Sequence, residues 1–175
     1  MSKFCFCIEF FSLSYYICPS MHAGINKIVI EWQDFNVDKN PSVGYRLQFH
    51  DFANDLFNRH PIKGNGTGSF TALFRMEKPV PSWNRTLLEP HRQYWLVASE
   101  FGILGLISLF FLFGSLFWAS WQLTAMRSIA ITSLVIFLVG NLTDSLLFYS
   151  GSGYFFIMCM ALSLGSAESP LKKFN

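Results

Sequence analysis

The chain has 175 residues, of which 51% are apolar and only 14% are charged, whereas soluble domains carry about 25% charged residues. A formal net charge of +2, with no basic patch interleaved with aromatic residues, argues against a nucleic-acid partner. The charges are also segregated, because Arg127 and Asp144 are the only formal charges between Phe101 and Ala167. The composition therefore predicts a membrane protein with an apolar C-terminal part.

The first segment, residues 1–22, is apolar but contains Glu9 and ends near Cys18-Pro19. A signal peptide, a signal anchor and the remnant of a longer protein's helix are all compatible with it. The cleavage signal before Ala23 is weak, which favours an anchor or remnant. The chain's four cysteines lie in apolar segments without a Cys-x-x-Cys pair, so we expect small buried side chains rather than disulfides.

Residues 23–93 are more polar and are predicted to form a loop outside the membrane. Within them an amphipathic helix is expected over residues 42–60, since an apolar stripe recurs at helical spacing and Pro61 should end it. That stripe consists of Tyr45, Phe49, Phe52, Ala53 and Leu56. Arg46 falls at the edge of the stripe, where a snorkelling flank residue is the simplest interpretation.

The loop after this helix carries three alternating glycines, Gly64, Gly66 and Gly68. Glycine permits backbone conformations that are closed to other residues, and exposed amides in such a loop could cradle a phosphate. The pattern is neither a Walker loop nor a dinucleotide fingerprint. A tight loop that returns the chain to the membrane is the simpler interpretation.

Residues 94–167 are predicted to form three transmembrane helices, over about 94–121, 128–148 and 148–165. Trp95 and Trp118 would be about 35 Å apart in one continuous helix, which matches the two aromatic belts of a bilayer. Orientation follows from basic residues. Arg127 lies between the first two spans, and Lys172 and Lys173 follow the third. These ends, including the tail of residues 168–175, are predicted to be cytoplasmic, and the loop of residues 23–93 periplasmic.

A histidine stands at the outer mouth of the first predicted span. His91 follows Pro90, and histidine titrates near physiological pH. If Pro90 is the first helical residue, the helix dipole would keep the ring of His91 neutral and able to accept a proton. The alternative is an interfacial histidine that caps the membrane helix.

Two carboxylates accompany this histidine in the predicted topology. Asp144 should lie near the outer end of the second span, on the same side as His91, because a charge inside a bilayer is costly. It could orient a catalytic group or pair with an arginine, and a purely structural pairing is equally compatible. Glu100, one turn inside the first span, is a lesser candidate.

These motifs together resemble a known family. Arg46 on a helix is followed by Arg59-His60-Pro61, by the three alternating glycines, and by Pro90-His91 with Gly102 and Gly105 opening a span. This order is similar to the C-terminal catalytic region of the bacterial O-antigen ligase and O-antigen polymerase superfamily, over about residues 42–165. The ligase signature has Asn, Ser or Gln directly after the histidine, where this chain has Arg92.

The resemblance implies an all-α, multi-pass membrane protein, part of a GT-C-like glycosyltransferase fold in the bacterial inner membrane. It implies transfer of polysaccharide from undecaprenyl diphosphate to lipid A–core at the periplasmic face, without metal or other cofactor. His91 would be the general base and Arg46 would stabilise the diphosphate. Substrate-binding candidates are Arg59, Gly64, Gly66, Gly68, Arg92 and Asp144, and the structural glycines are Gly102 and Gly105.

Members of that superfamily have about a dozen transmembrane helices and a further arginine in an upstream periplasmic loop. The present chain would supply only their C-terminal set, so we expect a C-terminal fragment, and residues 1–39 show no resemblance. The implied partners are the carrier-linked glycan, lipid A–core, membrane lipid and a polypeptide with the missing helices. Two alternatives stay open: an O-antigen polymerase, or a truncated non-catalytic fragment of such an enzyme.

Overall fold

The computed structural model describes residues 23–24, 26, 29–30 and 42–165. Residues 42–165 form five helices and no strand, which confirms the predicted all-helical class for this part of the chain. The helices are α3 (Ser42–Arg59), α4 (Ser69–Glu77), α5 (Gln93–Trp121), α6 (Arg127–Gly140) and α7 (Ser150–Gly165). The predicted anchor of residues 1–22 and tail of residues 168–175 lie outside the described residues.

The chain divides into two compact units, residues 1–48 and residues 49–175. The division falls inside α3. In the first unit, the start of α3 carries Arg46, which is exposed, and Gln48 Nε2 donates a hydrogen bond to the Gly44 carbonyl (3.3 Å). Everything described below belongs to the second unit.

An aromatic core joins the second half of α3 to α4. Phe49 and Phe52 of α3 meet Phe74 of α4 edge to face, with ring centroids 5.6 and 5.5 Å apart. Phe52 also contacts Phe70, and all four rings are buried. Edge-to-face aromatic pairs of this kind add to the burial of apolar area. The apolar stripe expected on the first helix is thus covered by a second, shorter helix.

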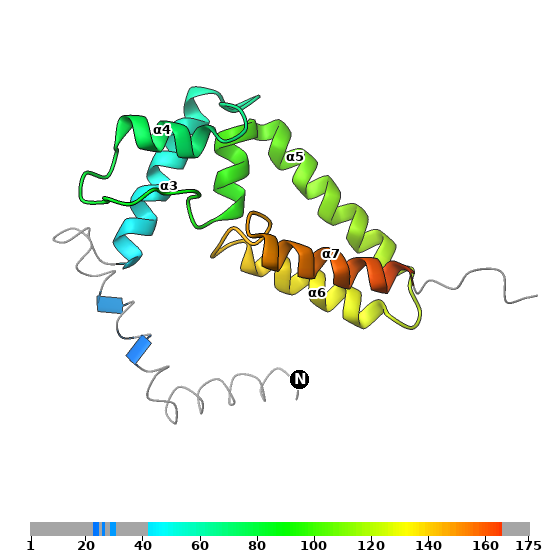
Figure 1. Cartoon of the computed structure of the whole chain (residues 1–175). Helices are drawn as coiled ribbons and strands as arrows, with labels where there is room; N and C mark the ends of the chain where they lie inside the picture. Colours follow the sequence, from blue (N-terminus) through cyan, green and yellow to red (C-terminus); the bar gives the residue numbers. More distant parts are fainter. Residues whose placement is uncertain (1–22, 25, 27–28, 31–41, 166–175) are drawn as a thin grey trace, which may run out of the picture. The chain divides into compact units, whose positions relative to one another are not determined.

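Helix α5 is broken at Gly102, where φ is 63° and ψ is −155°. Figure 1 shows its first turns at an angle to the longer part that follows. The loop of residues 61–66 lies against the break. Its backbone forms hydrogen bonds with amide and carbonyl groups of α5 that have no partner within the helix at this point. Four backbone hydrogen bonds join the two segments: Asn65 N to Ser99 O (3.1 Å), Gly66 N to Glu100 O (2.8 Å), Ile103 N to Pro61 O (2.8 Å) and Leu104 N to Ile62 O (3.3 Å).

The break corrects the expectation of one straight helix between two tryptophan belts. Because α5 bends at Gly102, Trp95 and Trp118 are not about 35 Å apart along a single axis. The part that remains straight, residues 103–121, is roughly 28 Å long, close to the ~30 Å hydrocarbon core of a bilayer. The first turns of α5 therefore belong with the loop region rather than with this segment.

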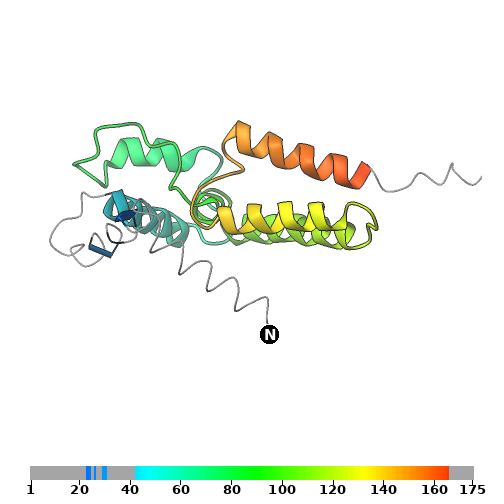
Figure 2. The same cartoon turned by 90° about the horizontal axis from the view of Figure 1, so that it is seen from below.

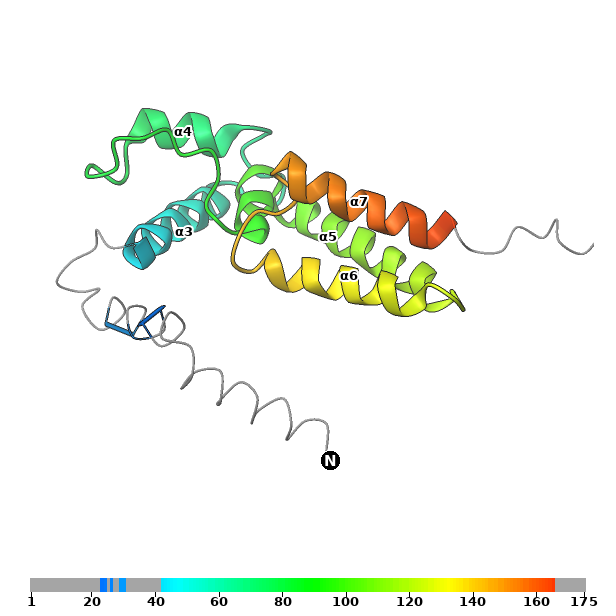
Figure 3. The ribbon, with the colours of Figure 1, turned by 60° about the horizontal axis from the view of Figure 1, so that its bottom comes forward.

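Helices α6 and α7 lie side by side along the C-terminal part of α5 (Figures 1 and 3). Their shared core contains one pair of stacked rings, Phe137 and Phe156, with centroids 4.1 Å apart. The other buried members of this core are Leu109, Phe113, Leu134 and Met160. The chain runs down α5, back along α6 and down α7, so residues 141–149 return to the end where α5 begins (Figure 2).

Among the described residues, α5 is the one helix long and apolar enough to cross a membrane. Helices α6 and α7 are apolar but shorter, with 14 and 16 residues. The sequence pattern predicted a second span to residue 148, whereas α6 ends at Gly140 and residues 141–149 are non-helical. Asn141, Thr143 and Asp144 use their side chains in local hydrogen bonds there, which compete with continuation of the helix.

Candidate functional site

The link of residues 141–149 and the start of α5 are held together by hydrogen bonds. The Gln93 amide donates to the Asn141 carbonyl (3.2 Å), and Arg92 Nε donates to the Leu142 carbonyl (2.8 Å). In the first turn of α5, the Tyr94 hydroxyl donates to the Leu138 carbonyl (3.1 Å). These contacts bring the polar residues of the link to the segment that precedes α5.

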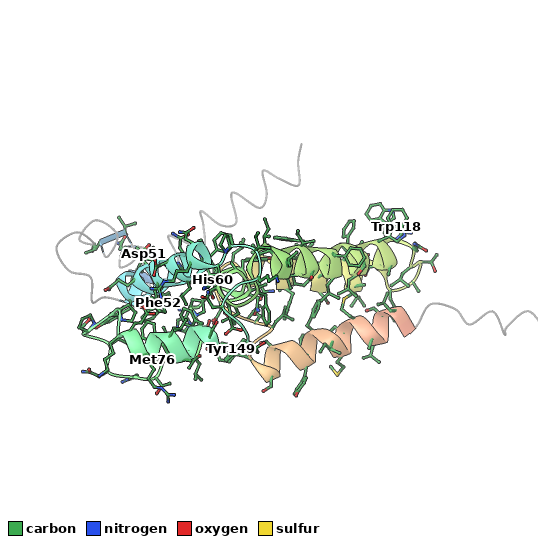
Figure 4. All side chains as sticks on the ribbon, turned by 90° about the horizontal axis from the view of Figure 1, so that it is seen from above. Asp51, Phe52, His60, Met76, Trp118 and Tyr149 are labelled. Atoms are coloured by element: carbon green, nitrogen blue, oxygen red, sulfur yellow. The ribbon has the colours of Figure 1, made fainter. Side chains whose placement is uncertain are left out.

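Glu89 is the centre of the polar cluster formed in this way. Its side chain is 2% exposed. Its Oε2 accepts hydrogen bonds from the Ser145 hydroxyl (2.5 Å) and the His91 amide (2.5 Å), and its Oε1 accepts one from the Tyr149 hydroxyl (3.0 Å). Figure 4 shows Tyr149 just before the first turn of α7. A buried carboxylate with this number of donors is well compensated for its loss of hydration.

His91 lies against this carboxylate. Its Nδ1 is buried and is 2.9 Å from Glu89 Oε1 and 3.5 Å from Asp144 Oδ1. The side chain as a whole is 29% exposed, and its ring lies 6.3 Å from the ring of Phe49 on α3. The structure thus brings together His91 and Asp144, two of the predicted site residues, and adds Glu89, which lies closer to the same nitrogen.

The backbone at His91 differs from the expected one. Helix α5 begins at Gln93 with Arg92 as its N-cap, and His91 has a positive φ of 56°. It is therefore not in the first helical turn, so that expected placement is wrong and the argument from the helix dipole loses its premise. The hydrogen bond from the His91 amide to Glu89 holds this left-handed conformation, and the neighbouring carboxylates become the dominant charges at the ring.

The ionisation of the cluster follows from these contacts. Burial alone would raise the pKa of the Glu89 carboxyl, but the hydrogen bonds from His91, Ser145 and Tyr149 and the charge of His91 outweigh it and hold this pKa below its usual range. Burial, the hydrogen bond to Glu89 and the negative charges of Glu89 and Asp144 raise the pKa of Tyr149 to about 12. At neutral pH the cluster therefore contains an ionised Glu89 and a protonated Tyr149.

The same residues have the composition of a metal-binding set. Glu89, His91 and Asp144 each offer a ligand atom within 4.8 Å of the other two. Carboxylate and imidazole groups bind divalent cations such as Zn²⁺. A cation there would compete with the close contact between His91 Nδ1 and Glu89 Oε1 (2.9 Å).

Other predicted substrate-binding residues have structural partners. Arg59 binds Asp55 (2.5 Å) and Glu77 (2.7 Å), and these bonds raise the pKa of its guanidinium and lower that of the Glu77 carboxyl. Arg92 is engaged with the Leu142 carbonyl through Nε. Arg59 therefore ties the end of α3 to the end of α4, and Arg92 ties the start of α5 to the link.

The glycines separate into two groups. A Cβ at Gly64 would collide with the backbone of Glu100, and a Cβ at Gly102 would lie 2.5 Å from the Ile62 carbonyl oxygen, so both permit the close approach of loop and helix. Gly66 and Gly68 have positive φ but open space around them. Gly105 is helical and packs against Phe101. The buried Glu100 carboxylate accepts hydrogen bonds from the Gly68 and Phe70 amides at the start of α4, which is a capping role.

The sequence pattern did not single out Glu89 or Tyr149. Glu89 stands two positions before His91, which is the one local signal that could have drawn attention to it. Its burial depends on the link of residues 141–149, some fifty positions away, and no local pattern encodes that contact. Tyr149 could not be identified for the same reason, since its contact with Glu89 joins distant segments and the sequence pattern placed it in a predicted membrane span.

Comparison with known proteins returned no match to a protein-family model, to a curated protein or to a solved structure.

Proposed function

We propose that the chain carries the catalytic histidine of an O-antigen ligase-type glycosyltransferase, in a multi-pass, GT-C-like fold of the bacterial inner membrane. The observation that carries the proposal is the contact of His91 with the buried, ionised Glu89, just before the start of α5. A histidine paired with a carboxylate is a common arrangement for a general base. The motif order around it supplies the substrate class.

The reaction proposed for this site needs one proton acceptor and one cationic group. His91 accepts the proton of a sugar hydroxyl on lipid A–core as that oxygen bonds to the anomeric carbon of the glycan. The bond from that carbon to the diphosphate oxygen breaks, and undecaprenyl diphosphate leaves with both electrons of the bond. His91 then releases its proton to water. Arg46 is proposed to bind the leaving diphosphate, since a guanidinium matches phosphate oxygens in a fork.

Membrane lipid and a second polypeptide complete the proposal. The diphosphate carrier is a lipid, so the site has to lie at the membrane boundary. Because residues 103–121 suffice for one span, the cluster at Glu89 and His91 would lie above the periplasmic surface, within reach of a carrier headgroup. A polypeptide that supplies the upstream helices of the superfamily is proposed as the partner that completes the carrier site.

Complementation of a ligase-null strain tests this function. The wild-type chain, alone or with a polypeptide carrying the upstream helices, is expected to restore attachment of polysaccharide to lipid A–core. His91→Ala should abolish attachment, because a general base contributes about 10²–10⁴-fold to rate. His60→Ala is the matched control, since His60 is exposed at the end of α3 (Figure 4) and has no proposed role. Normal attachment by His91→Ala at equal membrane expression would overturn the assignment.

Two other functions predict different products. An O-antigen polymerase would lengthen glycan on the carrier, so carrier-linked polymer would accumulate in the absence of attachment to lipid A–core. A non-catalytic fragment would give neither product, even with the upstream helices present. Analysis of the lipid-linked and core-linked glycans of the same strains therefore separates the three.

A further inference from the structure

The cluster around Glu89 specifies which nitrogen of His91 can act. Nδ1 is the buried nitrogen and lies 2.9 Å from Glu89 Oε1 and 3.5 Å from Asp144 Oδ1. An ionised carboxylate oxygen offers only lone pairs, and an unprotonated Nδ1 at this distance would place a second lone pair against them, so the nitrogen beside the carboxylate has to carry the proton. In the neutral imidazole the lone pair then resides on Nε2.

Glu89 itself is held in one orientation. The Ser145 hydroxyl and the His91 amide bind one carboxylate oxygen, and the Tyr149 hydroxyl binds the other beside Nδ1. A side chain that is 2% exposed and fixed at both oxygens has little freedom to turn away from the ring. The raised pKa of Tyr149 keeps that hydroxyl a donor throughout the physiological range.

We propose that Glu89 is a positioning residue that fixes the Nδ1–H tautomer of His91, so that Nε2 is the atom that accepts the proton of the acceptor hydroxyl. Glu89 acts through His91 and does not touch substrate. The proposal rests on the function proposed above, but its structural half, the position of the proton on the ring, is measurable without any substrate.

The first measurement is ¹⁵N NMR of the full chain with labelled histidine, in lipid nanodiscs, with His91→Gln used to assign the signal. At neutral or mildly alkaline pH the pyrrole-type, protonated nitrogen of His91 is expected to be Nδ1. In Glu89→Gln the tautomer preference should be lost, with signal intensity shared between the two forms. Protonation of His91 at Nε2 in the wild type would overturn the proposal, whatever the activity.

The second measurement is the pH dependence of glycan transfer. The titratable groups beside the His91 ring include Glu89 and Asp144, and Tyr149 binds Glu89. The ring also lies near Phe49 of α3, which is uncharged. Removing the Glu89 charge should make His91 harder to protonate. Glu89→Gln should therefore move the acidic limb of the kcat profile to lower pH and reduce the maximal kcat at least about tenfold, with KM little changed.

Matched variants distinguish positioning from general damage to the fold. Tyr149→Phe removes one hydrogen bond but keeps the Glu89 charge, so the acidic limb should stay in place. Asp144→Asn removes a charge that is farther from Nδ1 and more exposed, so it should move the limb less than Glu89→Gln. An unchanged limb and kcat in Glu89→Gln would contradict the positioning role. A different result separates this proposal from the proposed function. If the wild type carries the proton on Nδ1 of His91, but His91→Ala transfers glycan at the full rate, the proposed function fails while the pairing of His91 with Glu89 stands.

Discussion

At the scale of single residues, the site depends on a buried carboxylate that stays ionised. Glu89 lies deeper than any other acidic side chain described, and its donors come from its own segment and from the link of residues 141–149. The titratable residue His91 could be predicted from the sequence, because a histidine before an apolar run is visible locally. Glu89 could not, because its environment exists only after a distant segment has packed against it.

The ionisation of Glu89 predicts how stability depends on pH. Because its pKa in the folded protein is depressed below the ordinary value of 4.5, the ionised group stabilises the fold above that value. This contribution should be lost as the pH falls through the depressed pKa. Thermal unfolding of wild type and Glu89→Gln can be compared in detergent from pH 7 to pH 3. The Tm of the wild type should exceed that of Glu89→Gln at pH 7, and this difference should become smaller as the pH falls. A gap that is constant over this range would contradict the prediction.

The proposed chemistry also predicts the effect of metal removal. In the proposed mechanism the base is His91, which lies beside Glu89 and Asp144, and no cation takes part. Transfer activity should therefore keep at least about half its value after treatment with EDTA, since general-base catalysis requires no Lewis acid. Loss of activity that Zn²⁺ or Mn²⁺ restores would show instead that these three residues hold a metal.

At the scale of elements, the main feature is the junction between the loop of residues 61–66 and the break in α5. Gly102 opens the helix, and Gly64 lets the loop backbone approach it. The sequence pattern pointed to both glycines: Gly64 in a tight loop, with a phosphate cradle as the alternative, and Gly102 as a structural glycine that opens a span. Their joint role could not be predicted, since the two backbones that meet lie almost forty positions apart. The outcome is a bend that separates the first turns of α5 from residues 103–121.

Substitution of these glycines tests the junction. Gly102→Ala places a Cβ 2.5 Å from the Ile62 carbonyl oxygen at a φ of 63°, so it should destabilise the fold by about 1–3 kcal/mol or more. Gly114→Ala in the same helix has open space and should be neutral or stabilise by about 0.5–1 kcal/mol. Denaturant unfolding of both variants in detergent gives the comparison. Equal free energies of unfolding for the two variants would contradict the role of Gly102 in the junction.

At the scale of the whole molecule, the described part of the chain is helical, and one of its helices, α5, is long and apolar enough to cross a membrane. Its C-terminal helices expose large apolar side chains, among them Phe111 (77%), Ile136 (65%) and Leu162 (68%). Such surfaces in a monomer indicate contact with lipid or with other helices. The apolar runs predicted the order of these helices. Their lengths could not be predicted, because the polar residues after Gly140 stop α6 by local hydrogen bonding.

The proposed orientation predicts which loops face the periplasm. In a variant with its four cysteines replaced by serine, Asn84→Cys lies in the loop before α5 and Thr124→Cys lies between α5 and α6; both positions are exposed. An impermeant maleimide added to cells with a permeabilised outer membrane should label position 84 and leave position 124 unlabelled until the inner membrane is disrupted. The reverse pattern would invert the proposed topology and place His91 in the cytoplasm.

The most direct test of the account is glycan transfer by the purified full chain, with a polypeptide carrying the upstream helices, in proteoliposomes. The substrates are undecaprenyl diphosphate-linked glycan and lipid A–core. We expect the wild type to attach glycan to lipid A–core, His91→Ala to transfer it at least about 100-fold more slowly, and His60→Ala to leave the rate unchanged. Transfer by His91→Ala at the wild-type rate would show that His91 is not the catalytic base.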